Sequence, residues 1–358
     1  MAVPLLKSIR DSGDFSKSVE PYIPQLYALP RQILANIANP SGLGQLYVDT
    51  NPLISAFGLS VAFGAIFLVV SEINRNWSQV DRMWSILPNF YILHLAVWAR
   101  LAGLSHSRLD LVAVFSTIWS VRLTFNYWRR GGYQVGSEDY RWAIVKDHIP
   151  DIAFFILNVT FISFIQSVLL FAISGVPAYA ILLSNQFEKD ITAADVSYLI
   201  IQLALVLSEF VSDGQQQKYQ NAKHQYKKDG KVPEGFKRAD LDRGFNTTGL
   251  WAYSRHPNFF AEQLIWFVLY QWSCFATNNL FSWTFAGSAS LILLFQGSTW
   301  LTELITAKKY EEYELYQKNV GMFIPTSTQG YKTPTQGPKI IRTSELAKRQ
   351  ALKDTKQN

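Results

Sequence analysis

Long apolar stretches alternate along this chain with polar, mostly basic segments. A transmembrane helix needs about 20 predominantly apolar residues, and several stretches reach that length only with aromatic or polar residues at their ends. We therefore predict an all-α, polytopic membrane bundle of about seven transmembrane helices, with counts from six to eight allowed. The predicted spans are Leu53–Val70, Trp84–Ala99, Leu109–Phe125, Ile152–Ile173, Val196–Val211, Phe259–Cys274 and Leu280–Leu301. The short stretch Pro177–Leu183 is expected to be a re-entrant or interfacial piece.

The same pattern divides the chain into three parts. Residues 1–50 are predicted to form an interfacial or flexible N-terminal arm, and residues 51–325 the membrane domain, with a cofactor-binding half at about 195–325. Residues 326–358 are rich in Lys, Thr and Gln, and this composition predicts a disordered basic tail. Charged residues make up 17% of the chain, against about 25% in soluble domains, which agrees with membrane embedding.

The loop charges predict an orientation. The segment Asp213–Pro257 carries nine Lys and Arg residues, whereas Asn185–Asp195 carries three acidic residues and one Lys. Basic loops remain in the cytosol, so the basic loop, the C-terminus and a cofactor cavity are expected on the cytosolic side. This distribution accounts for the formal net charge of +6 without nucleic acid as a partner. The single cysteine, Cys274, excludes an internal disulfide and a cysteine metal cluster, and no metal site is expected.

Candidate chemistry is concentrated in the segment Asn246–Glu262. Arg255 can pair with a phosphate bidentately, and His256 can donate to a phosphate or a carbonyl. Asn258 offers a carboxamide, and Glu262 follows it by one helical turn. Snorkelling to lipid headgroups would explain Arg255 and His256, but it would not explain the two polar residues that lie deeper. A ligand site is therefore favoured, with Tyr253 in the same segment.

Two further groups of polar residues flank the other predicted spans. Glu209 and Asp213 lie one turn apart at the end of the fifth span, with Gln215 next to them, so they either meet a ribose, amide or Arg donor or are solvated at the helix end. Arg122 lies deep in the third span, where a charge usually faces a polar interior. Asp81, before the second span, is its candidate partner, in a catalytic pair or in a structural clamp.

Two basic or aromatic segments have alternative interpretations. The loop Arg129–Trp142 could cap a cofactor or anchor the protein at the membrane interface. Glu303 precedes a helix that carries Tyr310, Tyr313 and Tyr316 on one side. That helix could lie on the membrane surface, as amphipathic helices do, or fold back over a cofactor together with Glu303.

The motif GLWAYSRHPNFFAEQLIW, together with Glu209, Asp213 and Gln215 upstream, resembles the C-terminal domain of the steroid 5α-reductase superfamily, and an uncharacterised membrane branch of it most closely. That branch also carries segments similar to Val80–Ser85, Trp119–Leu123 and Arg129–Trp142. The similarity covers about residues 76–325. The R-H-P core alone is less specific, because isoprenylcysteine methyltransferases and sterol reductases share it.

The resemblance implies that NADPH binds in the cytosolic half and reduces a C=C bond conjugated to a carbonyl. The residues that would line the cofactor are Glu209, Asp213, Gln215, Tyr253, Arg255, His256, Asn258, Glu262 and Glu303. The Glu/Tyr pair of characterised steroid reductases has no counterpart that we can locate, so Asp81 and Arg122, with Tyr91 as a phenol donor, are the catalytic candidates. This departure leaves the substrate open among sterol-, isoprenoid- and acyl-like lipids.

Three functions follow as hypotheses. The first is a membrane reductase that uses NADPH, located by resemblance in the endoplasmic reticulum. The second is a methyltransferase of the isoprenylcysteine type that uses S-adenosylmethionine. The third is a non-enzymatic lipid-binding protein that kept the fold. The lipid bilayer and a lipophilic small molecule are the expected partners.

Overall fold

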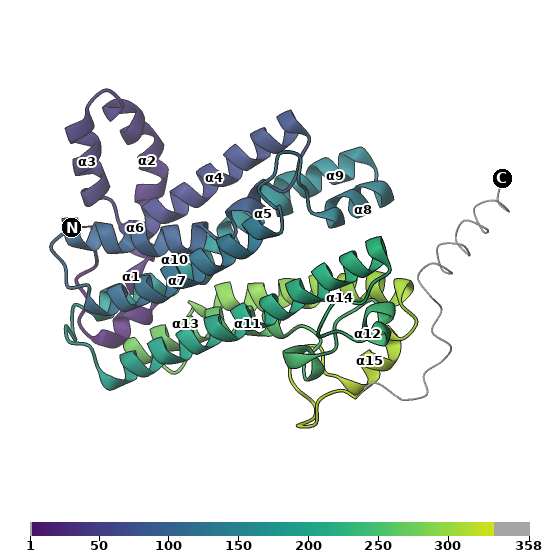
Figure 1. Cartoon of the computed structure of the whole chain (residues 1–358). Coiled ribbons are helices and arrows are strands. Elements are labelled where there is room, and N and C mark those ends of the chain that lie inside the picture. The colour runs from purple at the N-terminus through teal and green to yellow at the C-terminus, as the bar shows by residue number, and fades with distance from the viewer. Residues whose placement is uncertain (1, 333–358) are drawn as a thin grey trace. The chain divides into compact units, whose positions relative to one another are not determined.

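A computed structural model describes residues 2–332 of the chain (Figure 1). Within them, the regular elements are all helices, which confirms the predicted all-α class, and the one β-type pairing is an isolated bridge between Ser254 and Gly321. Most of the predicted disordered tail, residues 326–358, lies outside the described range. The chain forms two compact units. The first comprises Met1–Val206 and Gln263–Leu294, and the second comprises Leu207–Glu262 and Phe295–Asn358.

The first unit is built around α10 (Gln166–Ser184), which packs against α4 (Pro52–Asn74) and α6 (Leu87–Leu101), while α6 also packs against α7 (Ser107–Arg129). These helices lie side by side in Figure 1. Large aromatic side chains fill the core: Trp119 meets Trp266 edge to face, with ring centroids 4.9 Å apart, and both are fully buried. Such pairs bury much apolar area in a defined geometry.

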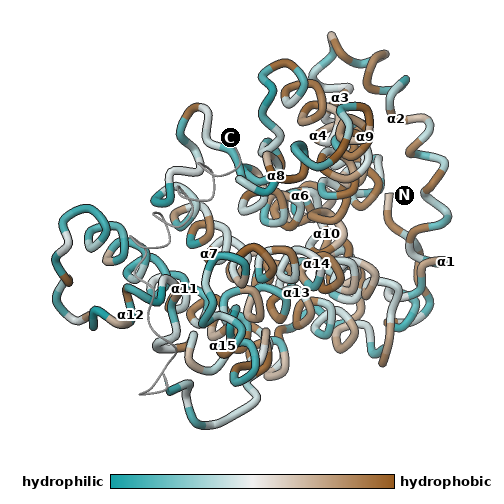
Figure 2. The backbone as a smooth tube through the Cα atoms, turned by 90° about the vertical axis from the view of Figure 1, so that its right-hand side faces the viewer, coloured by the Kyte–Doolittle hydropathy of each residue, from teal (hydrophilic) through white to brown (hydrophobic). Residues whose placement is uncertain are grey.

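Three of the predicted spans correspond to helices that are long and apolar enough to cross a membrane. They are Pro52–Asn74, the continuous run Asp151–Ser184 and α11 (Ala193–Asp229). Length and composition thus indicate a membrane protein. Figure 2 shows the apolar character of α4 and α10 and the hydrophilic residues around α12. The other four predicted spans fall on the helices α6, α7, α13 (Pro257–Ala276) and α14 (Phe285–Lys309).

One expectation from the sequence differs from the structure. Residues Pro177–Leu183 form the C-terminal part of α10 and are buried, so they are not a separate re-entrant piece. The run begins as α9 (Asp151–Leu157) and passes through a π-helical segment, Asn158–Ile165, before α10. Pro177 does not break the helix. In the interior of a helical bundle, neighbouring helices can compensate for the hydrogen bond that a proline removes.

The N-terminal residues are partly anchored in the first unit. Its short helices are η1 (Ile9–Gly13), α1 (Phe15–Ser18), η2 (Glu20–Tyr22), α2 (Ile23–Asn36) and α3 (Pro40–Asp49). The hydroxyl of Tyr179 donates to the carbonyl of Ser18 at 3.0 Å and accepts from Asn51 Nδ2 at 2.8 Å. In contrast, α2 and α3 form a pair with no buried residue. The residues before α2 are therefore fixed to α10, and the α2–α3 pair is the exposed part of the arm.

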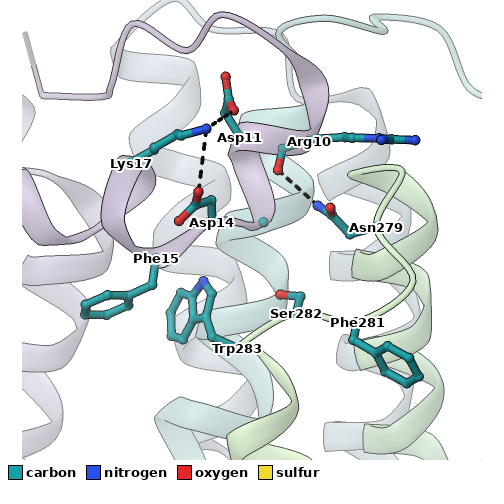
Figure 3. A pocket seen from close by; sticks show the side chains of 10 residues that line it. Arg10, Asp11, Asp14, Phe15, Lys17, Asn279, Phe281, Ser282 and Trp283 are labelled. Atoms are coloured by element: carbon teal, nitrogen blue, oxygen red, sulfur yellow. Dashed lines mark hydrogen bonds and ion pairs between the residues drawn. The ribbon is translucent and has the colours of Figure 1, made fainter.

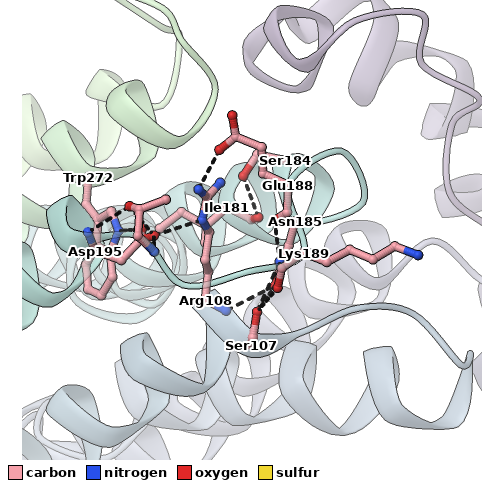
Figure 4. A network of polar contacts seen from close by, with 10 residues as sticks. Ser107, Arg108, Ile181, Ser184, Asn185, Glu188, Lys189, Asp195 and Trp272 are labelled. Carbon is pink, nitrogen blue, oxygen red and sulfur yellow. Dashed lines mark hydrogen bonds and ion pairs between the residues drawn. The ribbon is translucent and has the colours of Figure 1, made fainter.

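A buried ion pair fixes the connection between α10 and α11 within the first unit (Figure 4). Arg108, at the start of α7, is fully buried, and its Nε donates to Asp195 Oδ2 at 3.1 Å. The indole of Trp272 donates to the other oxygen of Asp195 at 2.8 Å, and Arg108 Nη2 reaches the exposed Glu188 at 2.6 Å. These contacts satisfy most of the polar groups that burial would otherwise penalise.

The second unit carries the polar segments that the sequence singled out. It contains the polar C-terminal half of α11, the start of α13, the end of α14 and three short helices. The short helices are α12 (Arg238–Arg243), η4 (Gly249–Ala252) and α15 (Tyr313–Asn319). The remaining short helices, α5 (Gln79–Met83) and α8 (Tyr140–His148), belong to the first unit. All nine predicted cofactor-binding residues fall in the second unit, and the three catalytic candidates fall in the first.

Candidate functional site

Arg255 precedes the helix α13 and is held by the carboxylate of Glu303, which lies near the end of α14. Arg255 Nε donates to Glu303 Oε1 at 2.6 Å, and Nη2 donates to Oε2 at 2.9 Å. The remaining guanidinium nitrogen, Nη1, donates to the carbonyls of Gln317 and Val320. Both charged side chains are buried. All three nitrogens of Arg255 therefore bond to the protein, and this Arg shapes the site without a free fork for a phosphate.

Three further side chains form hydrogen bonds with the carboxylate of Glu303. His256 Nε2 lies 3.0 Å from Oε1, Gln317 Nε2 donates to Oε2 at 2.9 Å, and the hydroxyl of Tyr313 donates to Oε1 at 3.2 Å. Burial by itself would raise the pKa of Glu303, but the hydrogen bonds from His256, Arg255 and Gln317 and the Arg255 charge lower it to about 2. Glu303 is thus an ionised anchor at neutral pH.

The backbone next to Arg255 is fixed by the segment that follows α15. Ser254 and Gly321 form a parallel bridge, in which Arg255 N donates to the carbonyl of Gly321 at 3.0 Å. Gly321 is required there, because a Cβ at this position would lie 2.1 Å from the carbonyl oxygen of Ile324. The hydroxyl of Tyr316, which is almost fully buried, donates to the carbonyl of Trp251. The C-terminal part of the second unit therefore closes over the Arg255–Glu303 cluster.

A second polar pair joins α11 to the first turn of α13. Asn258 Nδ2 donates to Asp213 Oδ1 at 3.1 Å. The carbonyl oxygen of the same amide, Asn258 Oδ1, is shielded from solvent and has no hydrogen-bond partner in the described part of the chain. A buried acceptor without a partner costs free energy, so a donor from a ligand would complete this site. This contact joins the ends of the fifth and sixth predicted spans directly.

Gln215 supports the loop that leads into the site. Its Oε1 accepts from the backbone N–H of Leu250 at 2.9 Å. The adjoining Gly249 has φ +65°, and a Cβ there would lie 2.5 Å from the Gln215 side chain. Gln215 therefore positions the loop before Arg255, and its acceptor oxygen is occupied by the backbone. Of the remaining predicted residues, Glu209 and Glu262 are buried, while Tyr253 is exposed.

In the first unit, two motifs that are far apart in the sequence meet. Asp81 on α5 accepts a hydrogen bond from the indole Nε1 of Trp142 on α8 at 3.0 Å. Glu138 accepts from the backbone N–H of Trp77 at 2.6 Å, and Asp139 N donates to Ser78 Oγ at 2.9 Å. The loop Arg129–Trp142 therefore packs on the segment that contains Asp81, which neither of its two sequence interpretations described.

The pKa values of the two aspartates at this contact, Asp81 and Asp139, are shifted in opposite directions. Desolvation raises the pKa of Asp81, against the lowering effect of hydrogen bonds from Ser78 and Trp142. Desolvation also acts on Asp139, but there the hydrogen bonds and charge of Arg141 outweigh it and lower the pKa. Arg141 donates to both oxygens of Asp139, at 2.9 and 2.8 Å. Asp81 is thus the carboxyl group with the greater tendency to hold a proton.

The other two catalytic candidates occupy the interior of the first unit. Arg122 is buried on α7. Tyr91 on α6 is fully buried, its ring meets Phe171 edge to face at 5.7 Å, and its hydroxyl has no hydrogen-bond partner among the described residues. Asp81 accepts a hydrogen bond from the indole of Trp142. The structure therefore brings Asp81 together with Trp142 and leaves the role of Arg122 as a prediction.

Comparison with known proteins identifies the family. Residues 67–320 match the model of the family described as "Protein of unknown function (DUF1295)". The chain belongs to this family. The matched region contains both groups of motif residues, from Asp81 to Glu303. An uncharacterised protein of Schizosaccharomyces pombe, C594.04c, is 36% identical over 325 residues, which cover 90% of this chain and 93% of the relative. No solved structure matches the chain.

Some residues of this candidate site were not singled out in the sequence. Gln317 donates to Glu303, and the carbonyl of Val320 accepts from Arg255. The indole of Trp251 in η4 donates to the carbonyl of Ser212 in α11 at 3.1 Å. The sequence signal that pointed to this region was the spacing of Tyr310, Tyr313 and Tyr316, which places them on one side of a helix. Tyr313 and Tyr316 are buried, so this helix packs within the second unit, and its place over a cofactor stays a prediction.

Proposed function

We propose that this protein is a membrane-embedded reductase that uses NADPH to reduce a C=C bond conjugated to a carbonyl in a lipophilic substrate. The observation that carries the proposal is the Asn258–Asp213 pair, because it presents an unpartnered buried carbonyl oxygen beside a carboxylate. A nicotinamide carboxamide has an NH₂ group that would donate to Asn258 Oδ1. The motif similarity to the steroid 5α-reductase superfamily supports the same assignment.

The residues of the second unit fit such a cofactor in different roles. Asn258 and Asp213 would contact it, whereas Arg255, His256 and Glu303 would hold the first turn of α13 in position. Pro257 opens that helix, where the free backbone N–H groups favour an anion. When bound, NADPH would supply a hydride to the β-carbon of the substrate. Glu209, Glu262 and Tyr253 complete the proposed lining.

The reduction also needs a proton, because hydride addition to an enone leaves negative charge on the carbonyl oxygen. Asp81 is the first candidate for the acid, since desolvation raises its pKa and Trp142 orients it. Arg122 and Tyr91 are candidates for polarising the carbonyl oxygen. The proposal further includes a bundle of about seven spans in the endoplasmic reticulum, with a cytosolic cavity and C-terminus, and a sterol-, isoprenoid- or acyl-like substrate.

The alternative proposals assign these residues differently. A methyltransferase would bind S-adenosylmethionine, and a lipid-binding protein would bind neither cofactor. The pairing of Asn258 with Asp213 favours the reductase, because an amide beside a carboxylate matches the donors of a nicotinamide ribose and carboxamide. The R-H-P core by itself favours neither enzyme.

Binding of NADPH to the detergent-purified full chain tests the proposal, with NADH and S-adenosylmethionine as competitors. Asn258→Ala should weaken NADPH binding about tenfold, because it removes a buried hydrogen-bonding amide. Asn319→Ala is the matched control, since Asn319 is exposed on the same unit and its side-chain amide donates to the carbonyl of Leu315. Displacement by S-adenosylmethionine would transfer the assignment to the methyltransferase, and binding of neither cofactor would reject both enzymes.

A further inference from the structure

Lys223 is a buried lysine without an acidic partner among the described residues. It lies on α11 after the end of the fifth predicted span and is only 8% exposed. Its Nζ donates to the backbone carbonyl of Gly244 at 2.9 Å, and one neutral acceptor does not compensate a buried charge. In the first unit, Nζ of the exposed Lys17 lies 2.7 Å from Asp11 and 3.6 Å from Asp14 (Figure 3). Lys223 thus lacks the counter-charge that even an exposed lysine has.

Two further lysines converge on the same place, one from α11 and one from the end of α14. Lys223 and Lys309 both lie over the ring of Tyr310, with Nζ 5.8 and 5.5 Å from its centroid. Burial, and then the charges of Lys227 and Lys309, lower the pKa of Lys223 to about 8. Partial burial, and then the charge of Lys309, also lower the pKa of Lys227. The three residues form a lysine cluster with no ion pair in the described part of the chain, and an anion would offset their mutual repulsion.

The lysine cluster is held by packed parts of the second unit. The backbone of Gly244, at the end of α12, lies against the ring of Tyr310. That ring also packs on Phe245, with centroids 5.9 Å apart. On the other side, Nζ of Lys223 lies 5.8 Å from the centroid of Tyr219, which is buried. Elements distant in the sequence therefore position the ammonium group of Lys223 before any ligand binds.

The lysine cluster lies at one end of a polar stripe on α11, and Asp213 of the candidate site lies at the other. The stripe consists of residues spaced by three and four, which share one helix face: Asp213, Gln216, Gln220, Lys223 and Lys227. Gln216 Oε1 is shielded from solvent and has no hydrogen-bond partner among the described residues. Lys223 follows Asp213 by ten residues, which is about 15 Å along a helix. This length is comparable with the separation of the nicotinamide and the 2′-phosphate in an extended dinucleotide.

We propose that the lysine cluster binds a phosphate monoester, which in the proposed reductase is the 2′-phosphate of NADPH. Such a group carries close to two negative charges and several acceptor oxygens, and lysine binds phosphate as a point charge. NADH has a hydroxyl at that position, so the cluster would select NADPH. Gln216 would accept from a hydroxyl of the same cofactor. The identity of the nucleotide rests on the proposed function, whereas the phosphate site rests on the three lysines.

Calorimetric titration of the detergent-purified full chain with adenosine 2′,5′-bisphosphate and with 5′-AMP tests the phosphate site, because the two probes differ only in the 2′-phosphate. Lys223→Met should weaken bisphosphate binding about tenfold and Lys309→Met about fivefold, with AMP binding unchanged. Lys309 is exposed, so its variant tests the site even where Lys223→Met fails to fold. Lys228→Met is the matched control, since Lys228 is an exposed lysine of the same helix outside the cluster.

The ratio of NADPH to NADH affinity in the same variants tests the assignment to the cofactor. Loss of the NADPH preference in Lys309→Met, with NADH affinity unchanged, supports it. A preference for NADPH that survives in both cluster variants would overturn the inference and leave the reductase proposal intact. Lysine-dependent binding of the bisphosphate without any binding of NADPH would instead reject the reductase and retain the phosphate site.

Two other results would count against the inference. Equal affinity of the wild type for the bisphosphate and AMP, or an equal loss in the Lys228 and Lys309 variants, would show that the cluster is not a phosphate site. Phosphatidic acid carries the same phosphate monoester on a lipid. Its binding through Lys223 and Lys309, without binding of the bisphosphate, would overturn the assignment to a nucleotide.

Discussion

Glu303 holds the guanidinium of Arg255 through two hydrogen bonds, of 2.6 and 2.9 Å, and both residues are buried. Two parallel bonds of this kind fix orientation as well as distance. Because His256 and Gln317 bond to the same carboxylate, one acidic residue near the end of α14 positions the residue before α13 and the helix that follows. The guanidinium of Arg255 is thus engaged by the protein in the described structure, and direct binding of a phosphate by this residue stays a prediction.

Loss of this carboxylate should destabilise the second unit. Glu303→Gln leaves Arg255 buried beside a neutral amide, and breaking a buried ion pair by removing one partner costs about 3 kcal/mol. The measurement is thermal unfolding in detergent, followed by intrinsic fluorescence. Glu314→Gln is a suitable control, since Glu314 is an exposed glutamate on α15. Equal unfolding temperatures for the two variants would contradict the assigned role.

The same residue predicts a pH dependence. The pKa of Glu303 is lowered from 4.5 to about 2 in the folded protein. A lowered pKa means that its contribution to stability is present above pH 4.5 and is lost as the pH falls towards 2. The difference in unfolding temperature between the wild type and Glu303→Gln should therefore be constant from pH 7 to about 5 and shrink below that. A difference that persists unchanged at pH 3 would argue against ionisation of Glu303.

Asp81 and Asp139 should respond to neutralisation with opposite signs. The pKa of Asp81 is raised, so its charged form is disfavoured by folding and stability falls as the pH rises above its ordinary value of 3.8. Asp81→Asn, which keeps an acceptor for Trp142, should stabilise the protein at pH 7. The pKa of Asp139 is lowered through Arg141, so Asp139→Asn should destabilise it. Unfolding temperatures at pH 7 and pH 4 measure both effects, and changes of the same sign would reject this assignment.

Most of the fold could be predicted from the sequence, because helical spans are defined by local apolar composition. Leu53–Val70 lies inside α4 and Phe259–Cys274 lies inside α13. The extent of α11 was not predictable in this way, since its polar half after Val211 depends on packing within the second unit. The stretch Pro177–Leu183 was expected to be a separate piece because it is too short to cross a membrane, whereas it continues α10 through its proline.

The candidate site was predictable in its residues but not in its contacts. The sequence located Arg255, His256 and Glu303 as polar groups that need partners, because buried charges are rarely unpaired. It did not show that Glu303 is the partner of the other two, since a separation of 47 or 48 residues has no local signature. For Asp81 the sequence suggested Arg122 as a partner, and that pairing stays a prediction; the structure adds the indole of Trp142 as a donor. Only the folded chain brings the loop with Trp142 onto α5.

The contact between Asp81 and Trp142 predicts energetic coupling. Removing the indole N–H with Trp142→Phe should cost about 1 kcal/mol, the usual net value of a hydrogen bond. The double variant with Asp81→Ala should lose less unfolding free energy than the two single variants lose together. Each single change already removes the shared hydrogen bond. A double-mutant cycle on unfolding free energy measures this coupling. Strict additivity would show that the hydrogen bond contributes nothing.

Arg108 offers the sharpest comparison, because one guanidinium meets two carboxylates with different exposure. The Asp195 side chain is fully buried, whereas the Glu188 side chain is 57% exposed. Asp195→Ala should destabilise the first unit by about 3–5 kcal/mol, since it leaves Arg108 buried and removes the acceptor of Trp272. Glu188→Ala should cost less than about 1 kcal/mol, because solvent screens an exposed pair. The contact distances alone would rank them the other way, with 2.6 Å to Glu188 and 3.1 Å to Asp195. Denaturant unfolding of the two variants decides between burial and distance, and a larger loss in the Glu188 variant would favour distance.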